Sequence, residues 1–330
     1  MSAQRDGGRM TANPGGPTPV AAREDQTFHG RGMLLRHANL VRLPHTIFAL
    51  PFALVGVVLA SYVAPITIGD VIWVVVAFTT ARFAAMGFNR IVDWEIDARN
   101  PRTRSREIPS GTISVREAGV AVVIASLAFL SAAWQLNGLC LTLAPFALAW
   151  VFFYSYTKRF TRWSHIVLGI GLSIAPVGGY LAIAGHWSSP WWMLIALAIA
   201  VATWVGGFDI LYALQDVSFD RENGLYSVPS TFGETNALRI ARLLHLTTVA
   251  ALALTGLGAG AGLFYFVGVL VAGALLLYEH SLVTVDDFSR LDAAFFTMNG
   301  VISIVFLGFV LIERLLAGTV FHGSFTVRLQ

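Results

Sequence analysis

Nine stretches of this 330-residue chain are each apolar over about 20 residues, and this feature restricts the fold more than any other. A hydrocarbon layer about 30 Å thick is crossed by a helix of roughly 20 apolar residues. We therefore predict an all-α polytopic membrane protein with nine transmembrane helices. The predicted spans cover residues 45–64, 70–89, 116–135, 138–157, 164–184, 191–213, 238–257, 261–280 and 294–316.

The composition supports this prediction, because 56% of the residues are hydrophobic and only 12% are charged. That charged fraction is about half that of a typical soluble domain. The net charge of +3 does not indicate nucleic-acid binding, since the arginines lie in the connections between spans, where membrane topology already accounts for most of them. The single cysteine, Cys140, has no partner for a disulfide.

The arginines also predict the orientation of the spans. The connections near 65–69, 135–138, 185–190 and 258–260 contain no Lys or Arg, whereas the alternate connections do. Because Lys and Arg are enriched in cytoplasmic loops, we expect a cytoplasmic N-terminus in the inner (cytoplasmic) membrane. Residues 1–30, rich in Gly, Pro, Ala and polar groups, are expected to form a disordered cytoplasmic tail, and 31–330 a single transmembrane domain.

Two acidic clusters stand at the ends of predicted spans. The first lies in residues 89–107, which hold five arginines and four acids and include Asp93 and Asp97. The second lies in residues 209–220 and contains Asp216 and Asp220, again four apart. Four predicted spans separate the clusters, so both are expected on the cytoplasmic face. We interpret them as two halves of one metal site.

Helical spacing extends each cluster into the membrane, because residues seven and eleven apart return to one face of a helix. The sets with this spacing are Arg82, Asn89 and Asp93, and Asp209, Asp216 and Asp220. Mg²⁺ prefers oxygen ligands and is usually held by one or two carboxylates together with substrate phosphates. Since arginines lie beside these acids, the pattern favours a metal-bridged polyphosphate. A cation-coupled transporter remains an alternative.

Other residues near the clusters have two interpretations. Lys158, the only lysine, shares a helix face with Tyr154 and suits either a phosphate or a positive-inside anchor. Aromatic rings beside the clusters either belong to an interfacial belt or shield a carbocation. Five histidines show no ligand spacing and receive no catalytic role: His45, His165, His186, His245 and His280.

Three ordered motifs resemble those of the UbiA superfamily of intramembrane prenyltransferases. They are Asn89-x-x-x-Asp93-x-x-x-Asp97 followed by Arg106-x-x-Pro-Ser-Gly, then Tyr154-x-x-x-Lys158-Arg159, then Asp216-x-x-x-Asp220. The resemblance extends over nearly all nine spans. It implies a ring of nine transmembrane helices around a central cavity, capped by the two Asp-bearing loops on the cytoplasmic side.

The resemblance also implies roles for residues. Mg²⁺ and the diphosphate of a polyprenyl donor would be bound by Asn89, Asp93, Asp97, Asp216 and Asp220, and the diphosphate would be held directly by Arg102, Arg106, Lys158 and Arg159. Asp93, Asp97, Asp216, Asp220 and Lys158 are the catalytic candidates. Further candidates for substrate binding are Arg42, Tyr154, Asp209 and Tyr212. One departure is visible, because many members have proline after the arginine, where this chain has Glu107.

Within the superfamily, the run from Gly207 to Gly233 and the NPRT at 100–103 look most similar to the 4-hydroxybenzoate polyprenyltransferase group. The MqnP-type members, linked to menaquinone made through futalosine, are especially similar. The implied function is magnesium-dependent transfer of a polyprenyl group to a 4-hydroxybenzoate-like or dihydroxynaphthoate-like aromatic acid in ubiquinone or menaquinone biosynthesis. A member with another acceptor, such as haem or a sugar phosphate, is the nearest alternative.

Overall fold

The computed structural model describes residues 32–42, 46–283 and 297–320, and within these ranges the chain forms helices joined by loops and turns, without strands. The expected tail at 1–30 and His45 lie outside the described residues. The elements in chain order are α1 (Met33–Leu40), α2 (Thr46–Ala60), α3 (Ile68–Val92), α4 (Trp94–Arg99), α5 (Val115–Leu136), α6 (Gly138–Thr157), α7 (Ser164–Ala184), α8 (Trp192–Tyr212), the 3₁₀ turn η2 (Ala213–Asp216), α9 (Val217–Glu222), α10 (Val228–Phe232), α11 (Glu234–Ala259), α12 (Leu263–Ser281) and α13 (Asn299–Val320).

A helix forms in each of the nine predicted apolar stretches. Within the described residues, eight helices are long and apolar enough to cross a membrane. The exception is α2, whose 15 residues extend about 22 Å at 1.5 Å per residue. This is shorter than a hydrocarbon layer of about 30 Å. The polytopic all-α prediction is confirmed, whereas the count of nine membrane spans stays a prediction.

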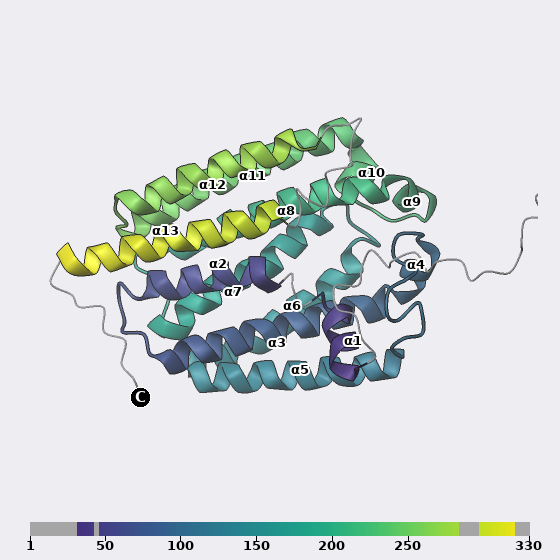
Figure 1. Ribbon diagram of the computed structural model, residues 1–330, viewed down its shortest axis with the longest axis horizontal. Coiled ribbons are helices and arrows are strands. Elements are labelled where there is room, and N and C mark those ends of the chain that lie inside the picture. The colour runs from purple at the N-terminus through teal and green to yellow at the C-terminus, as the bar shows by residue number, and fades with distance from the viewer. Residues whose placement is uncertain (1–31, 43–45, 284–296, 321–330) are drawn as a thin grey trace, which may run out of the picture.

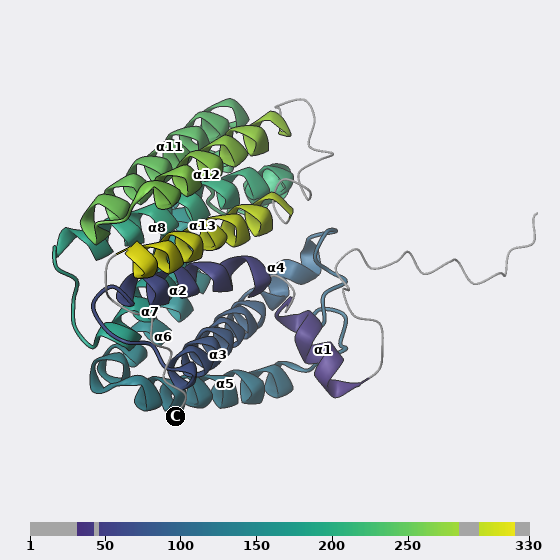
Figure 2. The ribbon, with the colours of Figure 1, turned by 60° about the vertical axis from the view of Figure 1, so that its left-hand side comes forward.

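Six helices close into a ring. In order around it, α2 packs on α7, α7 on α8, α8 on α11, α11 on α12, α12 on α13, and α13 returns to α2. The remaining long helices, α3, α5 and α6, pack together and join the ring through α2 and α7. Figure 2 shows α11, α12 and α13 on one side of α2 and α7, with α3 and α5 on the other.

Close approach of backbones holds the ring together. Lipid is as apolar as a leucine side chain, so helices in a membrane associate largely through tight packing at small residues. A Cβ added at Gly56 on α2 would overlap the carbonyl oxygen of Pro176 on α7, and one added at Gly179 on α7 would overlap that of Ala53 on α2. One turn before Gly56 on α2, the ring of Phe52 lies 4.6 Å from the ring of Trp204 on α8.

Short elements cover one end of the bundle, and we call them the cap: α4 with the loop 100–114, and η2 with α9 and α10 (Figure 1). Pro101 restricts the backbone of the residue before it, and Asn100 accordingly turns extended and ends α4. A capping box between Ser227 and Ser230 begins α10.

The structure corrects one sequence prediction, that Asp209, Asp216 and Asp220 share one face of a continuous α-helix. The helix α8 ends at Tyr212, and the chain continues as a 3₁₀ turn to Asp216. A 3₁₀ turn has three residues per turn instead of 3.6, so the spacing of seven no longer returns Asp216 to the face of Asp209. The helix α3 similarly ends at Val92, and Asp93 lies between α3 and α4.

Candidate active site in the cap

The two acidic clusters meet in the cap. Arg102, in the first cap loop, donates from Nε to Oδ1 of Asp216 at 3.0 Å and from Nη2 to Oδ2 of the same carboxylate. Asn100 donates to Oδ1 of Asp216 as well, at 3.1 Å. Bidentate contacts between arginine and carboxylate are among the strong, geometrically specific hydrogen bonds. The prediction that both clusters lie at the same end of the helices is therefore confirmed.

Asp93 is the most enclosed carboxylate of the first cluster, with 3% of its surface exposed. Asn89 donates to its Oδ2 at 3.0 Å, and Arg159 donates to its Oδ1 at 3.0 Å. The Nζ of Lys158 lies 3.8 Å from Oδ2. The structure thus brings Asp93 together with three other residues that the resemblance placed around a metal diphosphate.

Asp97 is buried in α4 between two arginines. The Nη1 of Arg106 donates to Oδ1 at 2.7 Å, and the Nη1 of Arg90 lies 3.8 Å from Oδ2. Burial favours the protonated acid, but Arg106 and Arg90 outweigh it and hold the pKa of Asp97 below its ordinary value. The Asp97 carboxylate is therefore charged, and within the described residues its Oδ2 accepts no hydrogen bond.

The fit of the cap to Mg²⁺ depends on these oxygens. Among the described residues, three or more His, Cys, Asp or Glu side chains nowhere gather into a metal cage. Mg²⁺ seldom needs such a cage, because one or two carboxylates together with phosphate oxygens usually hold it. The cap offers carboxylates on both loops and the buried Oδ2 of Asp97, which accepts no hydrogen bond there. These oxygen donors fit Mg²⁺ bound together with a diphosphate.

Asp209 lies apart from the arginine pairs. Its Oδ2 is 2.7 Å from Nδ1 of His165, and its side chain keeps 21% exposure. Tyr212, a further candidate for substrate binding, contacts the first cap loop: its hydroxyl accepts from Nη1 of Arg102 at 3.2 Å, and Arg102 stacks over its ring at 5.4 Å. Tyr154 lies within electrostatic range of both Asp209 and Asp93.

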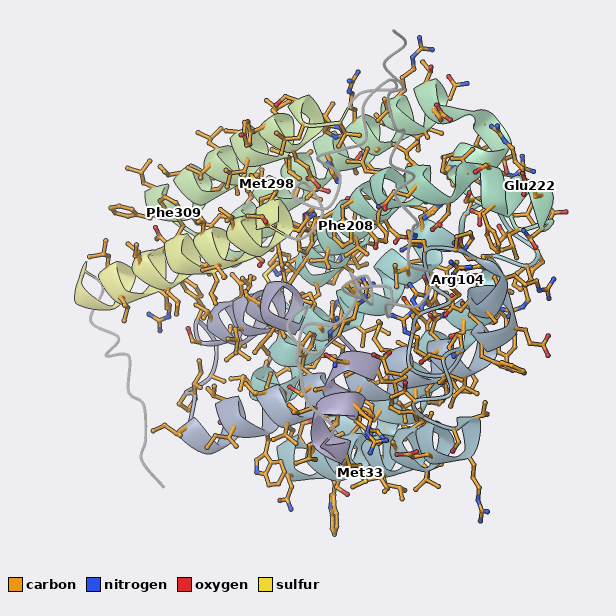
Figure 3. The ribbon with its side chains drawn as sticks, turned by 45° about the vertical axis from the view of Figure 1, so that its right-hand side comes forward. Met33, Arg104, Phe208, Glu222, Met298 and Phe309 are labelled. Atoms are coloured by element: carbon orange, nitrogen blue, oxygen red, sulfur yellow. The ribbon has the colours of Figure 1, made fainter. Side chains whose placement is uncertain are left out.

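The remaining predicted residues occupy the edges of the site. Arg42 follows α1 with a positive φ of 46° and lies within electrostatic range of Arg82 and Arg90. Glu107 is buried and within range of Arg90, so the acid that departs from the family pattern has a basic neighbour. Asp220 is also buried, in α9. Figure 3 shows Arg104 and Glu222 at the cap end of the molecule and Phe208 farther along the bundle.

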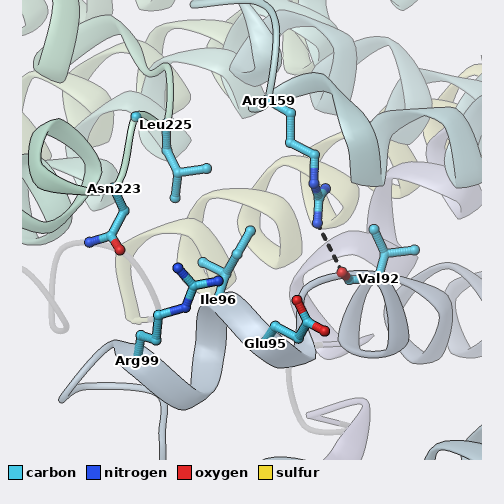
Figure 4. Close-up of a pocket in the computed structure, with 8 residues that line it drawn as sticks. Val92, Glu95, Ile96, Arg99, Arg159, Asn223 and Leu225 are labelled. Carbon is cyan, nitrogen blue, oxygen red and sulfur yellow. Dashed lines mark hydrogen bonds between the residues drawn. The ribbon is translucent and has the colours of Figure 1, made fainter.

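A pocket of about 330 Å³ opens in the cap beside Asp93. Val92, Glu95, Ile96 and Arg99 line one side, and Asn223, Gly224 and Leu225 line the other. Figure 4 shows Arg159 at its edge, where Nη2 donates to the carbonyl oxygen of Val92 at 2.9 Å. Because Arg159 also contacts Asp93, this pocket adjoins the candidate site.

The structure places two residues against the predicted acids for which the sequence indicates no site role. Arg90, one of the arginines of the first cluster, is buried, donates to the carbonyl oxygen of Leu40 and lies beside Asp97. His165, a lone histidine without ligand spacing, pairs with Asp209. Helical periodicity could have found Arg90, since it precedes Asp97 by seven residues. His165 left no such signal, because its partner lies 44 residues away.

Comparison with known proteins agrees with this fold. A 4-hydroxybenzoate octaprenyltransferase of Salmonella newport is 32% identical over 244 residues, which cover 72% of this chain and 82% of that protein. A UbiA homologue from Aeropyrum pernix K1, solved in its apo form, has a TM-score of 0.74 and 31% identity, covering 82% of this chain and 98% of that one.

A UbiA homologue from Archaeoglobus fulgidus, solved bound to GPP and Mg²⁺, has a TM-score of 0.63. It covers 84% of this chain and 99% of its own, and at 22% identity it supports the fold alone. The UbiA prenyltransferase family model matches residues 49–301, which is most of the chain. The chain therefore belongs to the UbiA prenyltransferase family and is a prenyltransferase.

Proposed function

We propose that this enzyme transfers a polyprenyl group from a polyprenyl diphosphate to an aromatic acid, 4-hydroxybenzoate-like or dihydroxynaphthoate-like, in ubiquinone or menaquinone biosynthesis. The observation that carries the proposal is the pairing of cap carboxylates with Arg102 and Arg106 of the first cap loop and with Arg159, which follows α6. The 4-hydroxybenzoate octaprenyltransferase relative supports an aromatic acid as acceptor. The A. fulgidus homologue bound to GPP and Mg²⁺ supports a prenyl diphosphate donor and a divalent metal.

Three carboxylates at the cap each accept a hydrogen bond from an arginine: Asp93 from Arg159, Asp97 from Arg106, and Asp216 from Arg102. A diphosphate entering the cap brings oxygens that compete for the same guanidinium groups, and Arg recognises phosphate as readily as carboxylate. As Arg159 and Arg102 turn to the diphosphate, Asp93 and Asp216 gain free oxygens. The arginines therefore offset the charge of the carboxylates and exchange partners when a diphosphate binds.

Asn89, Asp93, Asp97, Asp216 and Asp220 would hold the metal, which supplies a Lewis acid that neutralises charge on the departing diphosphate. Lys158 is suited to the same charge, because its side chain is 38% exposed and its Nζ lies 3.8 Å from Oδ2 of Asp93. Fixed cations aimed at a developing negative charge are a major source of rate acceleration.

Transfer breaks the bond between the allylic carbon and the diphosphate oxygen, and the electron pair leaves with the diphosphate. A carbon of the electron-rich aromatic ring then donates a π pair to the allylic carbon. The ring hydrogen at that carbon leaves as a proton, and its bonding pair restores the aromatic ring. Residues such as Tyr154 and Tyr212 can shield the intermediate cation with their π faces.

The proposal includes the setting of the enzyme. Eight apolar helices long enough to span a membrane are consistent with an integral membrane protein. We place it in the inner membrane with the N-terminus and the cap on the cytoplasmic side, because the arginine-bearing connections belong there by the positive-inside rule. Residues 31–330 would act as one domain, with 1–30 as a cytoplasmic tail.

The test is transfer of a radiolabelled polyprenyl diphosphate to 4-hydroxybenzoate by the purified protein in detergent, with Mg²⁺ and with excess chelator. Labelled aromatic product that requires Mg²⁺ and is lost in Asp93→Ala supports the proposal. Diphosphate release without that product would show that 4-hydroxybenzoate is not the acceptor, and dihydroxynaphthoate, haem and a sugar phosphate would be tested next. Absence of both activities across donors and acceptors would contradict it.

A further inference from the structure

His165 links the second cap loop to Asp209. Its ring lies in the first turn of α7, is 4% exposed, and contacts two partners from different elements. The backbone N–H of Val228, the first residue of α10, donates to Nε2 at 3.3 Å. On the opposite side of the ring, Nδ1 lies 2.7 Å from Oδ2 of Asp209, in the last turn of α8.

These two contacts determine where the ring of His165 carries its hydrogen. A backbone N–H can only donate, so the Nε2 that it contacts must present a lone pair. The hydrogen of the neutral ring is then on Nδ1, where it donates to the carboxylate of Asp209. The imidazole is therefore held in one tautomer and one orientation, with Asp209 as its acceptor.

The backbone group that fixes His165 is itself fixed. Ser227 and Ser230 form a reciprocal capping box, with hydrogen bonds of 2.9 and 3.2 Å, around the start of α10. This box positions the N–H of Val228, and Val228 is fully buried. The N–H of Val228 thus orients the His165 ring, and the ring in turn orients Oδ2 of Asp209.

The other oxygen of Asp209, Oδ1, indicates a role for this carboxylate besides its contact with His165. Oδ2 is occupied by His165, and the side chain as a whole keeps 21% exposure although it belongs to a membrane helix. Ionisable groups within a span usually face a polar cavity. Tyr154 is within electrostatic range of both Asp209 and Asp93, and Asp93 is the carboxylate that the diphosphate would approach.

We propose that Asp209 is the base that takes the ring proton of the aromatic acceptor, and that His165 is the positioning residue that aims it. This inference rests on the proposed function. The carboxylate of Asp209 becomes a carboxylic acid as the alkylated ring carbon loses its hydrogen, and it returns the proton to water after the product leaves. The Nδ1–H of His165 keeps Oδ2 engaged, which leaves Oδ1 as the oxygen that accepts the proton.

Two isosteric substitutions separate the contacts of His165. In His165→Asn, the amide nitrogen can occupy the place of Nδ1 and still donate to Asp209, whereas the contact with Val228 is lost. In His165→Gln, the amide oxygen can occupy the place of Nε2 and still accept from Val228, whereas the donor to Asp209 is lost. Asp209→Asn removes the base itself.

The measurements are kcat, the KM for each substrate, and the share of diphosphate released without aromatic product. General base catalysis contributes about 10²- to 10⁴-fold, so we expect Asp209→Asn to lower kcat on that scale. Loss of an orienting hydrogen bond commonly costs about 10- to 100-fold, and we expect such a loss in His165→Gln, with little change in the donor KM. His165→Asn should lose less of kcat than His165→Gln. The share of diphosphate that is released without aromatic product should rise in His165→Gln and in Asp209→Asn.

The opposite ranking would overturn the inference: if His165→Asn loses more turnover than His165→Gln, the ring serves only to anchor Val228. Equal kcat in both variants and the wild type would overturn it too. Both outcomes require wild-type enzyme that forms prenylated 4-hydroxybenzoate. Wild-type enzyme without that product would instead contradict the proposed function, so the two failures are distinguishable.

Discussion

Arg102 and Asp216 form the contact that joins the two halves of the cap, although 114 residues separate them in the chain. Both guanidinium and carboxylate are partly buried, with side-chain exposures of 25% and 19%. Only a planar guanidinium can present two parallel donors to one carboxylate. The geometry of this contact, in addition to its charge, therefore sets the distance between the loops.

Arg102→Lys keeps the charge but loses the two-pronged contact. We expect it to raise the KM for the prenyl diphosphate by about tenfold, the equivalent of roughly 1.4 kcal/mol of transition-state or donor binding. Arg104→Lys is the matched control, because Arg104 lies in the same loop and is exposed. Steady-state kinetics at saturating acceptor measure the effect. An equal change in both variants would show that only the net charge of the loop matters.

Asp97 should contribute stability that depends on pH. Arg106 and Arg90 hold the pKa of Asp97 below its ordinary value, so its contribution is fully present above that ordinary value. The contribution is lost as the pH falls through the lowered pKa of the folded state. Asp97→Asn should therefore unfold at a lower temperature than the wild type at pH 7, and the difference should narrow on acidification below about pH 4.

Breaking a buried ion pair leaves the partner charge unpaired, which commonly costs about 3–5 kcal/mol. Thermal unfolding of both proteins in detergent across this pH range measures the effect of Asp97→Asn. A difference in unfolding temperature that stays constant down to pH 3 would contradict the assignment of Asp97 as a carboxylate paired with arginine in the folded protein.

Two adjacent glycines of α7 provide a matched test of helix packing. A Cβ at Gly179 would overlap the carbonyl oxygen of Ala53 on α2, whereas a Cβ at Gly178 would meet nothing within 4 Å. Forcing extra atoms into a tight contact costs about 1–3 kcal/mol. We expect Gly179→Ala to lower the unfolding temperature and Gly178→Ala to leave it unchanged or raise it. Equal unfolding temperatures for the two variants would contradict the close approach of α2 and α7.

The sequence predicted those features that depend on composition and order along the chain. The apolar stretches located the long helices, and the four spans between Asp93 and Asp216 placed both clusters at one end. The choice of partners was not predictable. Arg102, Arg104 and Arg106 are equivalent by spacing, and the path of the cap loop decides that Arg102 reaches Asp216, Arg106 reaches Asp97, and Arg104 stays exposed.

Two further features depend on tertiary contacts. The 3₁₀ turn after Tyr212 rotates Asp216 away from the face of Asp209, and no periodicity in the apolar residues signals that change. His165 acquires its tautomer from the backbone of Val228, 63 residues away. A lone histidine in a sequence carries no information about such a partner. The length of α2 likewise depends on where the helix begins and ends in the structure.

The central claim is that the two cap loops form one site for a magnesium-bound prenyl diphosphate. The most direct test is the affinity for a prenyl diphosphate in detergent, with Mg²⁺ and with chelator, for the wild type, Asp93→Asn, Asp216→Asn and the double variant. We predict Mg²⁺-dependent binding that each single change weakens, with a double variant whose loss differs from the sum of the single losses, because residues of one network couple. Additive losses, or binding that is indifferent to Mg²⁺, would contradict the claim.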